Sequence, residues 1–160
     1  MCSSDLKIPE CERREGSNKQ RKEPIYAVID TNVIVSALLS SKKDSATVKI
    51  VEKLFDKEFI PLLSEEILWE YHSVLRRKKF SFTEELIQSL IDAIENLAEK
   101  ILPYPADEVL PDMKDLPFYE VVLTKNDPSA YLVTGNIKHF PQKAFVVTPR
   151  EFLELLQSEK

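Results

Sequence analysis

The stretch PIYAVIDTNVIVSALL, residues 24–39, sets the fold class of this chain. Its first part, Ile25–Ile29, is apolar throughout, which is the pattern of a short strand buried on both faces. Asp30 ends this run, and the polar pair Thr31 and Asn32 follows before a second apolar run begins. In open α/β sheets, ligands collect outside the carboxyl ends of the strands, which is where this spacing places Asp30.

The rest of the chain alternates between short apolar runs and amphipathic stretches. Further strands are predicted at residues 59–62, 130–133 and 144–147, with a weak fifth near residues 100–102. Helices are predicted at residues 44–57, 64–78, 82–99, 116–125 and 149–157. This alternation predicts an α/β fold with a central parallel sheet that is covered by helices on both faces.

Two helix starts carry capping signatures. Thr148 and Glu151 flank Pro149, and this arrangement predicts a capping box with proline in the first helical position. Ser81 and Glu84 have the same spacing and predict a second capping box.

Length and composition limit the organisation of the chain. With 160 residues, of which 43% are hydrophobic, the chain has room for one domain with its own core. Residues 1–23 are charged and polar, so we expect a disordered extension there and a single domain at residues 24–160. The only cysteines, Cys2 and Cys11, lie in that extension, which excludes a disulfide framework or a cysteine zinc site in the domain.

Charge and hydropathy bear on location and partners. No stretch resembles a secretory signal or a membrane span, so we expect a cytoplasmic protein that does not associate with membranes. The net charge of −5 is unfavourable for binding nucleic acid, because affinity for phosphates comes largely from Lys and Arg. A nucleic-acid site must therefore be local or must use metal ions.

Four polar residues are expected at one edge of the sheet. Asp30 follows the first strand, and Asn136 follows the strand at residues 130–133 in the same way. Asp115 precedes a helix that starts at Leu116-Pro117, which places it at the same edge. Taken singly, Asp30 and Asp115 are also read as helix N-caps, and Asn136 as a turn residue after glycine.

Glu70 is the fourth of these residues. On the predicted helix at residues 64–78, it lies about 100° from the centre of the apolar stripe, closer than Glu65 or Glu66. It is thus the acid most suited to border the buried face, although an exposed helical glutamate is the simpler reading. Oxygen ligands of this kind suit Mg²⁺ or Mn²⁺, which activate water for phosphodiester hydrolysis.

Several segments, in this order, resemble the PIN domain, in particular the bacterial PIN-domain toxins of toxin–antitoxin systems. They are AVIDTNVIVSALL (27–39), SEEILWEYHSVLRR (64–77), PDMKDLPFYEVVL (111–123), AYLVTGNIKHFP (130–141) and VVTPREFLELL (146–156). The resemblance implies a three-layer α/β/α fold and Mg²⁺- or Mn²⁺-dependent cleavage of RNA. It also implies inhibition by a cognate antitoxin, and many relatives of this type form homodimers.

Carried over by motif, the resemblance makes Asp30, Glu70 and Asp115 the catalytic carboxylates and metal ligands. The fourth acid of the family usually follows the Thr-Gly pair, and Asn136 takes its place here as a neutral ligand. An amide holds a second metal less tightly than a carboxylate does. A one-metal mechanism, weak activity, inactivity, or help from Asp112 or Glu120 are all open.

Basic side chains near these positions are candidates for binding RNA. Arg76 and Arg77 end the helix that carries Glu70, and Lys138 and His139 follow Asn136. The simpler readings are cations at a helix C-terminus and a surface-loop histidine. Trp69, Tyr71 and His72 read as ordinary helix residues.

Two other functions, a phosphatase and a binding module, are alternatives to a nuclease. An aspartyl-phosphate phosphatase needs a second aspartate two residues after the first, and position 32 is asparagine. A binding module with the same fold and no activity, for RNA or a protein partner, is the stronger rival. Asn136 and the acidic net charge favour it.

Overall fold

The computed structural model describes residues 24–158, so the stretch predicted to be a disordered extension lies outside the described residues. The described strands form one parallel sheet in the order β4-β3-β2-β5-β6. They are β2 (Tyr26–Ile29), β3 (Ile60–Leu63), β4 (Glu99–Lys100), β5 (Ala130–Val133) and β6 (Val146–Val147). The predicted parallel sheet is confirmed. Strand β6 is shorter than its predicted range, and β4 is both shorter and shifted by one residue toward the N-terminus.

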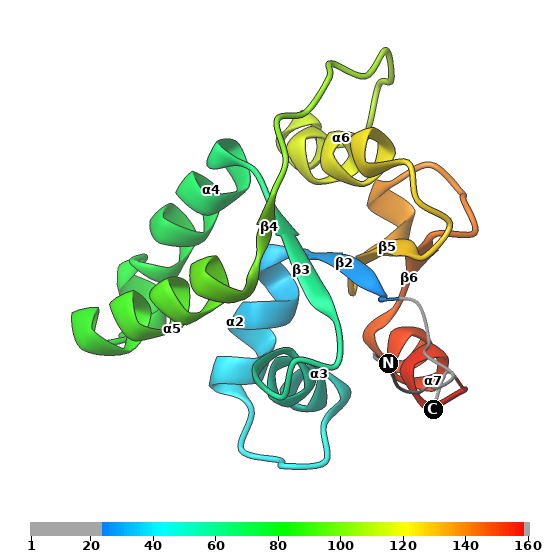
Figure 1. Cartoon of the computed structure of the whole chain (residues 1–160). Coiled ribbons are helices and arrows are strands. Elements are labelled where there is room, and N and C mark those ends of the chain that lie inside the picture. The colour runs from blue at the N-terminus through cyan, green and yellow to red at the C-terminus, as the bar shows by residue number, and fades with distance from the viewer. Residues whose placement is uncertain (1–23, 159–160) are drawn as a thin grey trace, which may run out of the picture.

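Helices cover both faces of this sheet. The α-helices are α2 (Thr31–Leu39), α3 (Ala46–Phe55), α4 (Glu65–Leu75), α5 (Glu84–Leu97), α6 (Leu116–Lys125) and α7 (Pro149–Ser158). Helix α6 packs on β2, β3 and β5 from one side, whereas α3 and α7 pack together on the other side (Figure 1). The predicted three-layer α/β/α architecture is confirmed.

Helix α2 is absent from the predicted helices, and its burial explains why. Val33, Ile34 and Val35 are consecutive in the sequence and all are buried. A helix that is surrounded by protein on most sides lacks the 3.6-residue alternation that reveals a surface helix. The apolar run was therefore recognised, but its helical conformation was not.

The two predicted capping boxes had different outcomes. The N–H of Thr148 donates to Glu151 Oε1 at 2.9 Å, and the N–H of Glu151 donates to Thr148 Oγ1 at 3.1 Å, which confirms the first box. The second prediction is wrong, because Thr83 caps α5 by accepting from the N–H of Leu86. Ser81 instead follows a short 3₁₀ helix in the left-handed region, with φ 56°.

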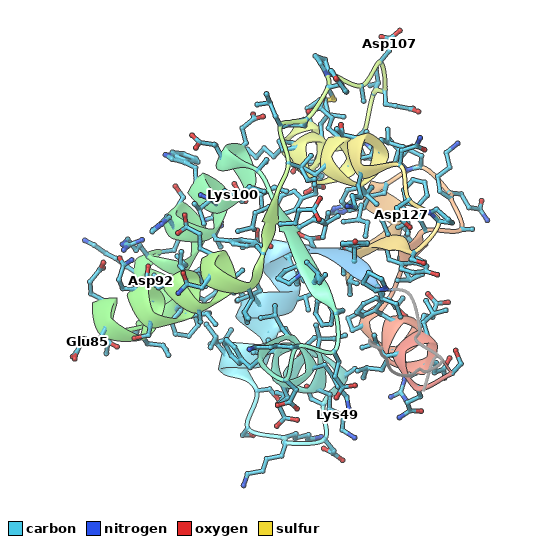
Figure 2. The ribbon with its side chains drawn as sticks, in the orientation of Figure 1. Lys49, Glu85, Asp92, Lys100, Asp107 and Asp127 are labelled. Atoms are coloured by element: carbon cyan, nitrogen blue, oxygen red, sulfur yellow. The ribbon has the colours of Figure 1, made fainter. Side chains whose placement is uncertain are left out.

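The core lies between the sheet and its helices, and of the charged side chains only Asp30 is buried among the described residues. Phe152 of α7 is fully buried and meets Phe59 edge to face, with ring centroids 5.0 Å apart. Charged side chains such as Lys49, Glu85 and Asp107 project from the periphery (Figure 2). Within residues 24–158, no helix has the length and apolar character needed to cross a membrane.

The strand order determines where a site can form. The chain runs from the central β2 outward through β3 to β4, and then crosses back to β5 and β6 on the other side. Such a reversal opens a crevice at the carboxyl ends of the two strands beside it, here β2 and β5. Because Ile29 pairs with Val133, the next residues, Asp30 and Thr134, are neighbours at this crevice.

Candidate functional site

Asp30 is held at the crevice by contacts on both strands. Its N–H donates to the carbonyl of Val133 at 2.9 Å, which continues the β2–β5 ladder by one residue. The side chain is only 4% exposed, and its Oδ2 accepts a hydrogen bond from Thr134 Oγ1 at 2.7 Å. Asp30 occupies the N-cap position of α2, yet its side chain makes no capping hydrogen bond. The N–H groups of Thr31 and Asn32 are still close enough to lower the pKa of Asp30, so the start of α2 stabilises its carboxylate without a capping hydrogen bond.

Thr134 is a site residue that the sequence patterns did not single out. Its hydroxyl is fully buried, accepts from the N–H of Asn136 at 3.0 Å and donates to Asp30 Oδ2. The contact joins residues 104 positions apart, so no local pattern reports it. One feature of the sequence could have indicated it. Asp30 and Thr134 each directly follow a predicted strand, so they become neighbours when β2 and β5 pair in register.

Asp115 approaches the same crevice from the N-terminus of α6. It is the last residue of a short 3₁₀ helix (Met113–Asp115) that leads directly into α6, and its side chain makes no capping hydrogen bond. Its backbone is helical, with φ −83° and ψ −12°, unlike the extended caps Ser45, Ser64 and Thr83. Its Oδ2 atom is buried and has no hydrogen-bond partner in the described part of the chain. His139 lies beside it, with Nδ1 3.4 Å from that oxygen, a distance that forms an ion pair only when the imidazole is protonated.

The protonation of both aspartates is shifted, chiefly by burial. Burial, together with the negative charges of Asp30 and Asp112, raises the pKa of Asp115 to about 6, and His139 partly opposes this rise. Burial also raises the pKa of Asp30, against the hydrogen bond from Thr134, the nearby amides and the charge of His139. The crevice thus concentrates negative charge in a place that water reaches poorly.

We expect the burial of these carboxyls, together with the charge repulsion on Asp115, to make the metal-free protein more stable at mildly acidic pH than at neutral pH. The native pKa of Asp115, about 6, exceeds its ordinary value of 3.8, so the native state binds a proton at a pH where the unfolded state does not. The free energy of unfolding should therefore rise, on the order of 1–2 kcal/mol, as the pH falls from about 7 to about 4.5. The raised pKa of Asp30 acts in the same direction.

Urea unfolding in a chelator at several pH values measures this effect. Asp115→Asn is the matched variant, because it keeps the shape and removes the titrating group. The rise on acidification should be smaller in the variant than in the wild type. Equal pH profiles for the two proteins would contradict the expected contribution of Asp115.

Neither Glu70 nor the side chain of Asn136 contacts Asp30 or Asp115 within the described residues. Glu70 is half-buried on α4 and makes no hydrogen bond or ion pair among the described residues. Asn136 is exposed, and its contribution to the site is the backbone N–H that binds Thr134. The next residue on α4, Tyr71, is fully buried, and its hydroxyl donates to the carbonyl of Ile29. Tyr71 is thus more than an ordinary helix residue.

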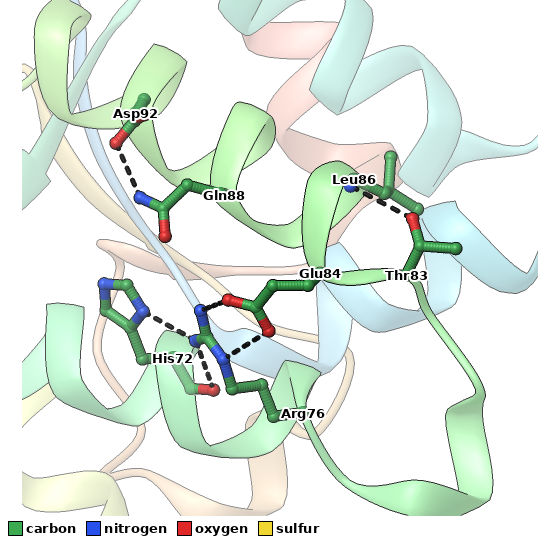
Figure 3. A network of polar contacts seen from close by, with 7 residues as sticks. All are labelled: His72, Arg76, Thr83, Glu84, Leu86, Gln88 and Asp92. Atoms are coloured by element: carbon green, nitrogen blue, oxygen red, sulfur yellow. Dashed lines mark hydrogen bonds and ion pairs between the residues drawn. The ribbon is translucent and has the colours of Figure 1, made fainter.

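The predicted RNA-binding cations differ in their surroundings. Arg76 is engaged by Glu84 through two nitrogens and also contacts His72 Nδ1 at 2.7 Å (Figure 3). Its charge is therefore largely offset. Arg77 and Lys138 are exposed and form no ion pair within residues 24–158, whereas His139 reaches Asp115.

The two acids that were considered as substitutes for a fourth ligand have separate roles. Asp112 Oδ1 accepts from the N–H of Lys114 at 3.0 Å, and its charge acts on Asp115. Glu120 Oε2 accepts from the N–H of Ala106 at 2.8 Å and so ties the loop before α6 to that helix. Of the two, only Asp112 has an electrostatic link to the site.

The carboxylates of the crevice can be compared with the ligands that a divalent metal ion needs. No group of three Asp, Glu, His or Cys side chains within the described residues is gathered closely enough to hold a metal ion. Mg²⁺, however, is commonly bound by one or two carboxylates, with waters and substrate phosphate completing its shell. The charge of Asp30 raises the pKa of Asp115, and the buried Oδ2 of Asp115 accepts no hydrogen bond within the described residues, with only the His139 ring 3.4 Å away. Two such carboxylates fit a hard divalent cation.

Comparisons with known proteins give one match. The family model described as PIN domain matches residues 26–138, a span that runs from β2 to the residues after β5 and includes Asp30, Glu70, Asp115 and Asn136. No curated protein and no solved structure matches the chain.

Proposed function

Because the chain belongs to the PIN domain family, whose members are generally metal-dependent nucleases, we propose that it is a Mg²⁺- or Mn²⁺-dependent endoribonuclease. The reaction is hydrolysis of an RNA phosphodiester bond. Water attacks phosphorus, and the bond from phosphorus to the leaving oxygen breaks.

One observation carries this proposal above the others. Asp30 and Asp115 lie at the starts of α2 and α6, neither side chain makes a capping hydrogen bond, and the charge of Asp30 helps to raise the pKa of Asp115. Asp30 has the same extended backbone as Ser45 and Ser64, so a purely structural role would favour a capping bond there. Holding two carboxylates together raises the free energy of the metal-free protein, which is typical of residues kept for binding or catalysis.

Each residue has a proposed role. Asp30 and Asp115 would hold the metal, with Glu70 completing the set from α4, and Thr134 fixes one oxygen of Asp30 so that the other is available. When bound, the metal lowers the pKa of a water and offsets charge on the phosphate. His139, beside Asp115, is exposed and is placed to contact a phosphate oxygen or pass a proton.

Asn136 favours one metal over two. It supplies no charge, and its side chain makes no hydrogen bond among the described residues. The negative charge available to hold metal therefore comes mainly from the two aspartates. The exposed Arg77 and Lys138 would bind RNA phosphates. Arg76, paired with Glu84, would contribute less to RNA binding than sequence reasoning predicted.

The biological setting is also part of the proposal. The motifs resemble those of toxins, so we infer a toxin whose cognate antitoxin inhibits it, acting in the cytoplasm as a monomer or homodimer. The rival is an inactive binding module, which is favoured by the lack of a three-ligand cluster among residues 24–158.

Cleavage and metal binding distinguish these two functions. We expect purified protein to cut a mixed-sequence RNA with Mn²⁺ or Mg²⁺ and to stop when a chelator is added. Calorimetry should give close to one ion per chain. A protein that binds neither ion and cuts no RNA would be a binding module instead.

A further inference from the structure

Three surface cavities in the described part of the chain differ in charge. A cavity of about 930 Å³ between α6 and α7 is bordered by Asp127, Glu151 and Glu154 and by no basic residue. A second, of about 390 Å³, mixes acids and bases along α3 and α7. The third, also about 390 Å³, contains two lysines, Lys138 and Lys143, and no acid. In a chain with a net charge of −5, that makes the third cavity the one suited to an anion.

The lining of this third cavity combines charge with apolar surface. Its apolar side chains come from Ile137, Phe140, Pro141 and Val146, and Gln142 adds an amide. Phe140 is nearly fully buried and therefore rigid, whereas Ile137 is 44% exposed at the mouth. A volume of about 390 Å³ is at the small end of ligand pockets, which suits a group of the size of a nucleoside.

The lysines are not engaged elsewhere. Lys138 and Lys143 are exposed, and within residues 24–158 neither forms an ion pair, whereas Lys53, Lys100 and Lys125 each pair with a glutamate. An unpaired lysine beside apolar surface can bind a phosphate without first breaking an internal contact.

This cavity is joined to the candidate site by one short 3₁₀ helix. The helix, η3 (Ile137–His139), carries Ile137 and Lys138 at the cavity, and its last residue, His139, reaches Asp115. Asn136, which precedes it, binds Thr134 and hence Asp30 through its N–H. An RNA strand that lies across η3 would therefore contact both the carboxylates and the cavity.

We propose that this cavity, defined by Ile137, Lys138, Phe140, Pro141, Gln142, Lys143 and Val146, binds one unpaired nucleotide of the RNA next to the cleaved phosphate. The base lies against the apolar lining, and the flanking phosphates contact the two lysines. The inference rests on the proposed ribonuclease function and deepens it, because a base can enter such a cavity only when it is unstacked and unpaired.

Binding without cleavage tests the cavity separately from the enzyme activity. Fluorescence anisotropy in a chelator compares a short single-stranded oligoribonucleotide with the same sequence in a duplex, over a range of salt concentrations. We expect the single strand to bind more tightly. The double variant Lys138→Ala/Lys143→Ala should bind about 10-fold more weakly at low salt, and its salt slope should fall by about 1.4, the value for two phosphate contacts on a single strand.

The matched control is Lys42→Ala/Lys43→Ala, which removes the same charge from exposed residues in the loop between α2 and α3. That control should bind like the wild type. A third variant, Ile137→Ser, should weaken binding of the intact oligonucleotide but not of one with an abasic site. Equal binding by the two lysine double variants, or equal affinity for duplex and single strand, would overturn the cavity proposal. Loss of cleavage in all proteins with binding retained would instead count against the ribonuclease function alone.

Discussion

Asp30→Asn should remove metal-dependent RNA cleavage almost completely, by about 10²–10³-fold or more, and should leave the folded protein at least as stable as the wild type. The side chain is 4% exposed and lies near Asp115, whose pKa its charge raises. An amide oxygen can still accept the hydrogen bond from Thr134. The substitution therefore removes a buried charge and retains the shape, so activity and stability should change in opposite directions.

The measurement pairs a cleavage assay in Mn²⁺ with thermal unfolding in a chelator. Asp44→Asn is a suitable control, because Asp44 is exposed in a loop away from the crevice and its loss should alter neither quantity. Mn²⁺ should raise the midpoint of unfolding of the wild type and of the control, and it should do so much less for Asp30→Asn. Unchanged cleavage by Asp30→Asn would remove Asp30 from the catalytic group.

Tyr71→Phe should lower the turnover rate about 10-fold and destabilise the protein by roughly 1–3 kcal/mol, the cost of a buried acceptor without its donor. The Tyr71 hydroxyl donates to the carbonyl of Ile29, the residue directly before Asp30, and it lies next to Glu70 on α4. Burial and the charge of Asp30 raise the pKa of Tyr71, so the hydroxyl stays protonated and remains a donor. Its loss frees α4 to shift relative to the end of β2.

Enzyme kinetics distinguish a general loss of stability in Tyr71→Phe from a loss of correct positioning at the site. We expect the rate constant for turnover to fall with little change in KM, at a temperature where both proteins are fully folded. Tyr131→Phe is the control, since the Tyr131 hydroxyl makes no hydrogen bond within the described residues and its ring packs against Phe152. If both variants lose activity in proportion to their stability, Tyr71 does not position the site.

The sequence contained enough information for the layers and for part of the site. Helix α6 begins and ends where the sequence predicts, at Leu116 and Lys125, because Pro117 in its first turn marks the start. Asp30 and Asp115 were placed at one sheet edge from strand and helix ends alone, and the structure brings them within electrostatic reach of each other. These predictions succeeded because they depend on local signals and on the geometry of parallel sheets.

What the sequence did not reveal depends on contacts between distant residues. Thr134 and Tyr71 act on the end of β2 across 104 and 42 positions, and neither residue type is unusual in its own segment. Thr83 caps α5 in place of Ser81 because Ser81 adopts a left-handed backbone conformation, which the Ser81–Glu84 spacing in the sequence does not reveal. The roles of Glu70 and Asn136 as metal ligands stay predictions.

The pairing of β2 with β5 also fixes when, during synthesis, the crevice can form. Asp30 and its hydrogen-bond donor, Thr134, are 104 positions apart, and the strand that pairs with β2, Ala130–Val133, is made just before Thr134. A nascent chain that ends before β5 therefore contains Asp30 but neither the strand nor the hydroxyl that holds it in place. The crevice can assemble only after β5 has left the ribosome, so its formation is a late step relative to the synthesis of β2.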